Sequence, residues 1–63
     1  ISEREKTFLG YACTDLTYKE IATAMSLSER TIDGYREALF HKFKVQSRVG
    51  LAVAAIRKDL IRL

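Results

Sequence analysis

Several residue types are scarce or absent in this chain. It contains one cysteine, one histidine, no proline and no tryptophan among 63 residues. A single cysteine forms no intramolecular disulfide, and one cysteine with one histidine is too small a set for a usual zinc site. A chain this short buries only about 60% of the surface that it exposes when unfolded. Helix packing and self-association are therefore the stabilising devices left to it.

Long apolar runs are also missing. No run approaches the roughly 20 apolar residues of a membrane span, and the first residues lack the apolar region of a signal peptide. We therefore expect a soluble domain with no membrane partner, and a lone thiol fits a reducing cytoplasm. The chain begins at Ile1 and not at methionine, so we expect a piece of a longer protein.

The excess positive charge lies in one segment. The formal net charge is +3, and residues 30–48 hold five basic and two acidic side chains, which account for all of it. A local basic footprint indicates a polyanionic partner. A solvated helix face with a chance bias explains the charge alone equally well.

Helical periodicity and capping signals predict an all-α domain. No segment alternates with period two over a useful length. Ser2 with Glu5, and Thr17 with Glu20, have the spacing of capping boxes, while Ser28 and Ser47 are single N-cap candidates. The predicted helices span residues 2–13, 18–25, 28–43 and 48–60. We expect one four-helix domain over residues 1–63.

The second and third predicted helices match a helix-turn-helix. Ala22 is the small residue needed where the two helices cross, and Met25 and Leu27 are the apolar residues on either side of the turn. Ile32 and Tyr35 supply the stripe that the third helix buries. The pattern favours DNA binding, although helical hairpins with similar spacing occur in proteins that never touch nucleic acid.

The third helix has a polar face opposite this stripe. At 100° per residue, one arc contains Arg30, Asp33, Gly34, Glu37 and His41. A helix in the major groove presents its N-terminal residues to base edges. The predicted base contacts are therefore Arg30, Asp33, Gly34 and Glu37.

Each of these residues also has a plainer interpretation. Arg30 reads guanine or lies on a phosphate, and Asp33 and Glu37 accept from cytosine N4 or are solvated helix surface. Gly34 costs about 1 kcal/mol relative to alanine inside a helix. It either lets the backbone approach the groove or is a tolerated surface glycine. Two carboxylates near DNA are unfavourable, and Arg36 is placed to offset Asp33.

Phosphate contacts are expected around the edges of this face. The candidates are basic or hydroxyl-bearing residues near helix starts and on the far side of the third helix. They are Lys19, Ser28, Thr31, Lys42, Lys44, Gln46 and Arg48. Such contacts fix the register on the duplex and carry no sequence information.

The fourth helix has more apolar residues than one core needs. Val49, Val53, Ile56 and Leu60 fall within an arc of about 60°, and the rest of its apolar residues lie on another face. An exposed aliphatic stripe invites a partner, and a two-fold dimer through it would set two recognition helices about one DNA turn apart. Alternatively, the small domain covers both faces in part.

Several segments in order resemble the LuxR-type helix-turn-helix domain, the C-terminal output domain of NarL/FixJ response regulators and of quorum-sensing regulators. ISEREKTFL is similar to LTxRExEVL, LTYKEIA to LSNKEIA, LSERTIDGY to ISEKTVKTH, and KFKVQSR to KLGVRSR. The match runs without gaps over nearly the whole chain.

The resemblance implies a bacterial DNA-binding regulator whose third helix reads the major groove and whose fourth mediates dimerisation. We expect no cofactor and no metal. It also implies a receiver or ligand-sensing domain upstream. By motif match it favours Lys19, Thr31 and Arg48 as phosphate contacts. Asp33, Gly34 and Glu37 occupy positions that vary with the target sequence.

The chain departs from the family pattern at four places. Tyr35 replaces a usual histidine, while Asp15 and Lys44 replace usual glycines. Asp33 stands where the family often has lysine. The first three substitutions should be tolerated, whereas Asp33 indicates an unfamiliar target site.

Two other function classes are open to a small helical domain. An enzyme is not expected, because Cys13 lies beside an apolar helix face and His41 has no local partners that resemble a catalytic set. The main alternative is a helical protein-interaction module that contacts RNA polymerase or another regulator through the fourth helix.

Overall fold

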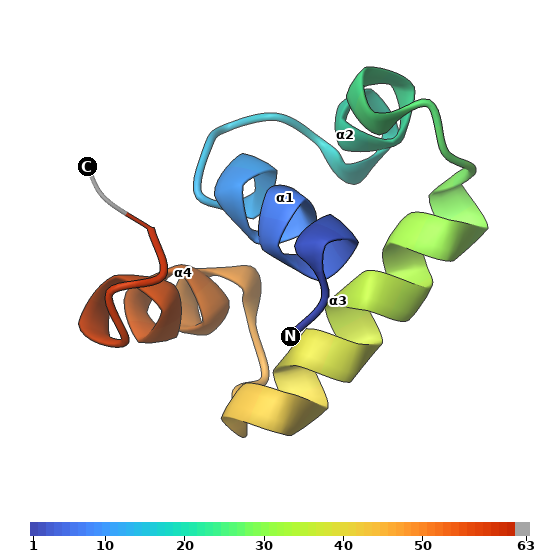
Figure 1. Cartoon of the computed structure of the whole chain (residues 1–63). Coiled ribbons are helices and arrows are strands. Elements are labelled where there is room, and N and C mark those ends of the chain that lie inside the picture. The colour runs from blue at the N-terminus through green and yellow to red at the C-terminus, as the bar shows by residue number, and fades with distance from the viewer. Residues whose placement is uncertain (62–63) are drawn as a thin grey trace.

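The computed structural model of the chain describes residues 1–61, which form four helices and no strand. They are α1 (Glu3–Ala12), α2 (Tyr18–Met25), α3 (Glu29–Phe43) and α4 (Arg48–Arg57). Helix α1 lies in the middle of the molecule, α2 and α4 lie on either side of it, and the long α3 runs past (Figure 1). The prediction of an all-α, four-helix domain is confirmed.

Hydroxyl side chains begin all four of these helices. Ser2 and Thr17 form complete capping boxes with Glu5 and Glu20, in which each partner accepts from the other's backbone N–H. The Ser28 hydroxyl accepts from the Thr31 N–H at 3.1 Å, and Ser47 does the same for Gly50 at 3.0 Å. Each cap satisfies an N–H that has no partner within its helix.

The capping boxes make stability depend on acid pH. The Ser2 N–H donates to Glu5 at 3.0 Å and the Thr17 N–H donates to Glu20 at 2.8 Å, and these backbone hydrogen bonds lower the pKa of both carboxyls. A pKa lower in the folded than in the unfolded state gives stability that is present above the unfolded value and is lost as pH falls through the folded one.

We therefore expect the melting temperature to fall as the pH is lowered from about 6 to below 4. Glu20→Gln is the matched control, because glutamine completes a capping box without titrating. Thermal unfolding followed by circular dichroism should show a smaller acid loss for Glu20→Gln. An identical loss in both proteins would remove Glu20 from the acid response.

Helices α2, α3 and α4 end with the same backbone conformation. A non-glycine residue with positive φ follows α2, α3 and α4, and these residues are Ser26, Lys44 and Asp59. In each case the next residue is apolar, donates its N–H back to the last helical turn, and packs against the core. The left-handed conformation costs a non-glycine residue roughly 1 kcal/mol. This cost explains why the family pattern usually has a glycine where this chain has Lys44.

Helix α4 is shorter than predicted. The expected span was residues 48–60, but the helix ends at Arg57, because Asp59 adopts φ 58° and turns the chain. Leu60 then donates its N–H to the Ala55 carbonyl at 2.9 Å and its side chain packs against the core. Leu60 therefore does not continue the outer stripe of α4, and its assignment to that stripe is wrong.

All four helices contribute to one apolar core. Its fully buried large side chains are Phe8, Leu9, Ile21, Ile32, Leu39 and Leu51. Ala22 of α2 is 4% exposed, as expected for the small residue predicted where α2 and α3 cross. The Phe8 ring lies 6.2 Å from the rings of Tyr18 and Tyr35, so aromatic contacts join α1 to both helices of the hairpin.

None of the helices in the described part of the chain combines the length and apolar character that a transmembrane span requires.

Candidate nucleic-acid interface

Helix α3 buries one side and exposes the other. Ile32 and Leu39 are fully buried, whereas the four predicted base-contacting residues are all exposed. These four, Arg30, Asp33, Gly34 and Glu37, are called the reading face below. The N-terminus of α3 follows the turn at Ser26, where φ is 56° and Leu27 donates to the Ala22 carbonyl at 2.9 Å. This turn packs α2 against the buried side and leaves the reading face free of other helices.

The two carboxylates of the reading face share one arginine. Nη2 of Arg36 donates to Glu37 at 3.0 Å and lies 3.7 Å from a carboxylate oxygen of Asp33. The expected pairing of Arg36 with Asp33 is present, and the pairing with Glu37 is the shorter of the two. The reading face is therefore less negative than its own residues suggest.

Gly34 lies on the reading face in open space. A Cβ atom built there meets nothing within 4 Å, and the backbone φ is negative. No contact or turn within the domain therefore requires a glycine at this position. What a glycine permits here is a close approach of another molecule to the α3 backbone.

The predicted phosphate-contacting residues do not all face one way. Lys19 is exposed in the first turn of α2. Lys44 and Gln46 line a hollow together with Glu37 and His41, so they adjoin the reading face. The ammonium of Lys42, by contrast, lies 3.9 Å from the Glu5 carboxylate of α1.

The hydroxyls of Ser28 and Thr31 are engaged with each other. Their oxygens are 3.0 Å apart, and Ser28 also accepts the Thr31 N–H as the cap of α3. A phosphate contact by Thr31 has to share or replace this hydrogen bond.

Arg48 faces the end of α1. Its Nε donates to the Ala12 carbonyl at 2.9 Å, and its Nη2 donates to the Thr14 carbonyl at 2.9 Å. Its guanidinium also lies 5.0 Å from the centroid of the Tyr18 ring. These carbonyls are left without partners where α1 ends, so Arg48 acts as a cap supplied from another helix. The structure thus gives this side chain a structural role, and its predicted phosphate contact stays a prediction.

Sequence reasoning missed this role, although a signal was available. Arg48 is the first residue of α4, where the helix dipole disfavours a positive charge. A cation at that position indicates another partner, and the negative end of α1 supplies one.

Helix α4 exposes an aliphatic stripe. Val49 is 74% exposed, Val53 44% and Ile56 41%, while Leu51 and Ala55 of the same helix are fully buried. The three exposed residues, called the α4 stripe below, line a largely apolar hollow with Ala12 and Cys13 at the end of α1. Burial raises the pKa of the Cys13 thiol, and the charge of Arg48 opposes this only in part.

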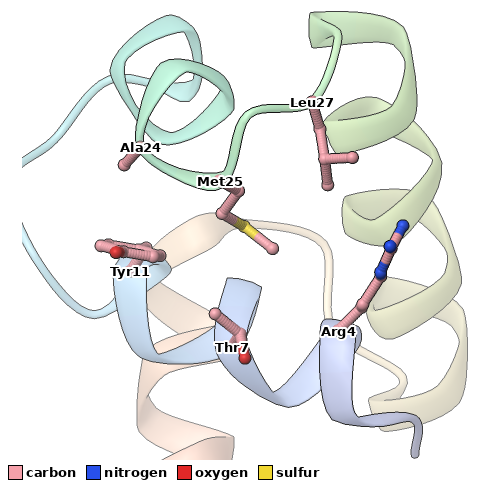
Figure 2. Close-up of a pocket in the computed structure, with 6 residues that line it drawn as sticks. All are labelled: Arg4, Thr7, Tyr11, Ala24, Met25 and Leu27. Carbon is pink, nitrogen blue, oxygen red and sulfur yellow. The ribbon is translucent and has the colours of Figure 1, made fainter.

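A third hollow lies between α1 and the end of α2 (Figure 2). Arg4, Thr7 and Tyr11 line it from α1, and Met25 points toward α1 from the other side. None of the predicted DNA-contacting residues is among its lining residues. This surface therefore serves as an internal control for any mapping of the reading face.

Comparison with known proteins agrees with these features. The family model described as "Bacterial regulatory proteins, luxR family" matches residues 1–55. The chain belongs to the luxR family. The resemblance inferred from the motifs is thereby confirmed, together with the helix-turn-helix fold class.

Individual luxR-family relatives are longer than this chain. A putative transcriptional regulator of Pseudomonas aeruginosa is 38% identical over 97% of the chain, which covers 30% of that protein. The probable transcriptional regulator ycf29 of Pyropia yezoensis is 33% identical over the same share, which covers 28% of that protein. The DNA-binding transcriptional activator DevR/DosR of Mycobacterium tuberculosis is 36% identical over 87% of the chain, which covers 25% of that protein. No solved structure matches the chain.

Proposed function

We propose that this luxR-family domain binds double-stranded DNA as the DNA-binding part of a transcriptional regulator. Helix α3 enters the major groove with the reading face toward the base edges. Lys19, Lys44 and Gln46 contact phosphates beside it. Ser28 and Thr31 hold the first turn of α3 and contact a phosphate through their hydroxyls, whereas Lys42 and Arg48 serve the fold.

One observation carries this proposal. The outer side of α3 has no large apolar residue, and no helix of the described residues supplies it with a partner, although α3 is the longest of the four helices. Lys44 is exposed beside this side of α3, and Lys19 is exposed in the first turn of α2, the helix before it. A polar helix face with a cationic rim fits a duplex groove better than a protein partner, because protein interfaces have apolar centres.

The α4 stripe is the proposed dimer surface. It presents three adjacent aliphatic side chains on the outside of a small domain, which indicates an interaction site. A two-fold pairing through α4 buries the stripe of both copies and places two reading faces on successive turns of one duplex. An upstream receiver or sensing domain, as in a response regulator, would control this pairing.

Selection from random duplexes, followed by titration at several salt concentrations, tests the proposal. The two cationic phosphate contacts of each subunit, Lys19 and Lys44, predict a slope of about −2 for log affinity against log salt, or a loss of roughly tenfold between 50 and 200 mM. Binding to RNA polymerase or another protein through the aliphatic stripe predicts almost no slope. No enrichment of any duplex would contradict DNA binding.

Gly34→Ala separates stability from recognition. Alanine is about 1 kcal/mol more favourable than glycine inside a helix, and open space surrounds this position. We expect the variant to unfold at higher temperature and to bind the selected duplex more weakly, because a methyl group holds the α3 backbone away from the bases.

Gly10→Ala is the matched control for this change. A Cβ atom built at Gly10 lies 3.8 Å from Ile61, which is an ordinary van der Waals contact. Gly10 belongs to α1, whereas the reading face belongs to α3. The Gly10→Ala variant should give a similar gain in stability with unchanged affinity. Equal affinities for all three proteins would mean that Gly34 does not touch DNA.

A further inference from the structure

Arg36 occupies the border between the core and the reading face of α3. Its side chain is 30% exposed, and its guanidinium lies 5.5 Å from the ring centroid of Tyr18 and 6.0 Å from that of Phe40. Two aromatic rings, one from α2 and one from α3 itself, thus restrict where the charged group can lie. A guanidinium held in this way is more fixed than one on a solvated helix surface.

The outer edge of this guanidinium holds both carboxylates of the reading face. One atom, Nη2, serves Glu37 at 3.0 Å and Asp33 at 3.7 Å, while those two side chains remain 71% and 58% exposed. The Nε atom is buried and has no hydrogen-bond partner among the described residues. The arginine therefore leaves one donor unpaired while its other end points at the two acids.

We propose that Arg36 is a positioning residue that sets the base preference of the reading face. It holds Asp33 and Glu37 as hydrogen-bond acceptors and offsets enough of their charge for the helix to approach the phosphates. The preferred target is a duplex with cytosine where these carboxylates meet the major groove. This inference rests on the proposed DNA binding.

The choice of cytosine follows from the base edges. An ionised carboxylate only accepts hydrogen bonds. Guanine and thymine present acceptors in the major groove, and adenine places its N7 acceptor beside its N6 donor. Cytosine presents the N4 donor without an acceptor of its own, so it is the base that repels a carboxylate least.

Charge offset matters because the phosphates are close. Without Arg36, Asp33 and Glu37 bring two negative charges to a polyanion. With Arg36 beside them and Arg30 on the same face, the group is neutral as a whole. Loss of Arg36 should therefore weaken binding even if its own atoms never reach the DNA.

The test compares four proteins by selection from random duplexes and by titration of the enriched site. They are the wild type, Asp33→Asn/Glu37→Gln, Arg36→Met, and the triple variant that combines all three changes. For the wild type we expect cytosine at one or more positions of each half-site. Replacing that C·G pair with T·A should lower affinity at least about fivefold. The double variant should lose this preference in favour of adenine, which Asn and Gln read through N6 and N7.

Arg36→Met keeps an apolar stem against the two rings and removes the charge. We expect it to bind the cytosine site about tenfold more weakly, because the charges of the two carboxylates are no longer offset near the phosphates. The triple variant should recover most of that affinity without the cytosine preference. A change in base preference is a readout that a purely structural arginine would not produce.

Three results overturn the inference while DNA binding stands. The first is a wild-type site without cytosine preference, and the second is a cytosine preference that survives in the double variant. The third is a triple variant as weak as Arg36→Met, which makes Arg36 itself a phosphate contact. If thermal unfolding shows that Arg36→Met is not folded, the base preference of the double variant decides the test alone, since both of its substituted positions are exposed. Failure of the wild type to enrich any duplex instead contradicts the proposed function, and this inference with it.

Discussion

Arg48→Met is expected to lower the free energy of unfolding by about 2–3 kcal/mol. Hydrogen bonds to a charged group contribute about 1.5–3 kcal/mol each, and Arg48 makes two of them, at 2.9 Å, to the carbonyls of Ala12 and Thr14. Partial exposure reduces this sum. A domain of this length has a total stability of roughly 3–9 kcal/mol, so the change removes a large part of it.

The melting temperature should accordingly fall by about 10–20 °C, as measured by circular dichroism. Lys42→Met is the matched control, because it also removes a cation predicted to contact phosphate. Its ion pair within the described residues is with Glu5 at 3.9 Å, and such a surface pair contributes about 0.2–1 kcal/mol. If Arg48→Met is as stable as Lys42→Met but binds DNA poorly, the phosphate role predicted from the sequence is correct after all.

The second large effect is expected at the α4 stripe. Val53→Glu places a charge at the centre of the proposed dimer surface, at a position that is already 44% exposed in the single chain. The fold should therefore persist, while affinity for a duplex with two half-sites falls by about a hundredfold, because linked binding events are lost. Affinity for a duplex with one half-site should stay nearly unchanged.

Thr7→Glu controls for the added negative charge, since Thr7 is exposed on α1 and lies outside the stripe. Titration of both variants with one-site and two-site duplexes separates the two effects. An equal loss on both duplexes, or no loss for Val53→Glu on the paired site, would contradict a dimer through α4.

Local patterns in the sequence predicted the helix starts and the faces of α3. Ser2 with Glu5 and Thr17 with Glu20 each act over three residues, and their capping boxes form as expected. The stripe through Ile32 and Leu39 repeats within one helix, so its burial follows from spacing alone. The reading face follows as the side of α3 opposite this stripe.

What the sequence did not reveal depends on contacts between distant segments. Arg48 and Ala12 are 36 positions apart, and no local pattern states that their atoms meet. The end of α4 was missed for another reason. Asp59 ends the helix in the left-handed conformation that glycine usually adopts at this position. The sequence has neither a glycine nor a proline there to indicate the helix end. Leu60 was consequently placed on the stripe and not in the core.

The role of Arg36 was only half predictable. Its spacing from Asp33 indicated an ion pair within one helical turn, and that pair is present. The rings of Tyr18 and Phe40 beside it were not predictable, because Tyr18 belongs to another helix. These contacts turn an ordinary surface pair into a fixed one.

The most direct measurement is a nuclear magnetic resonance titration of the domain with its selected duplex. The account predicts that the amide signals of Asp33, Gly34 and Lys19 shift strongly, while those of Thr7 and Ala24, beside the hollow in Figure 2, hardly move. Shifts confined to α1 and α4, with the amides of α3 unchanged at saturating duplex, would contradict the claim that the outer side of α3 reads DNA.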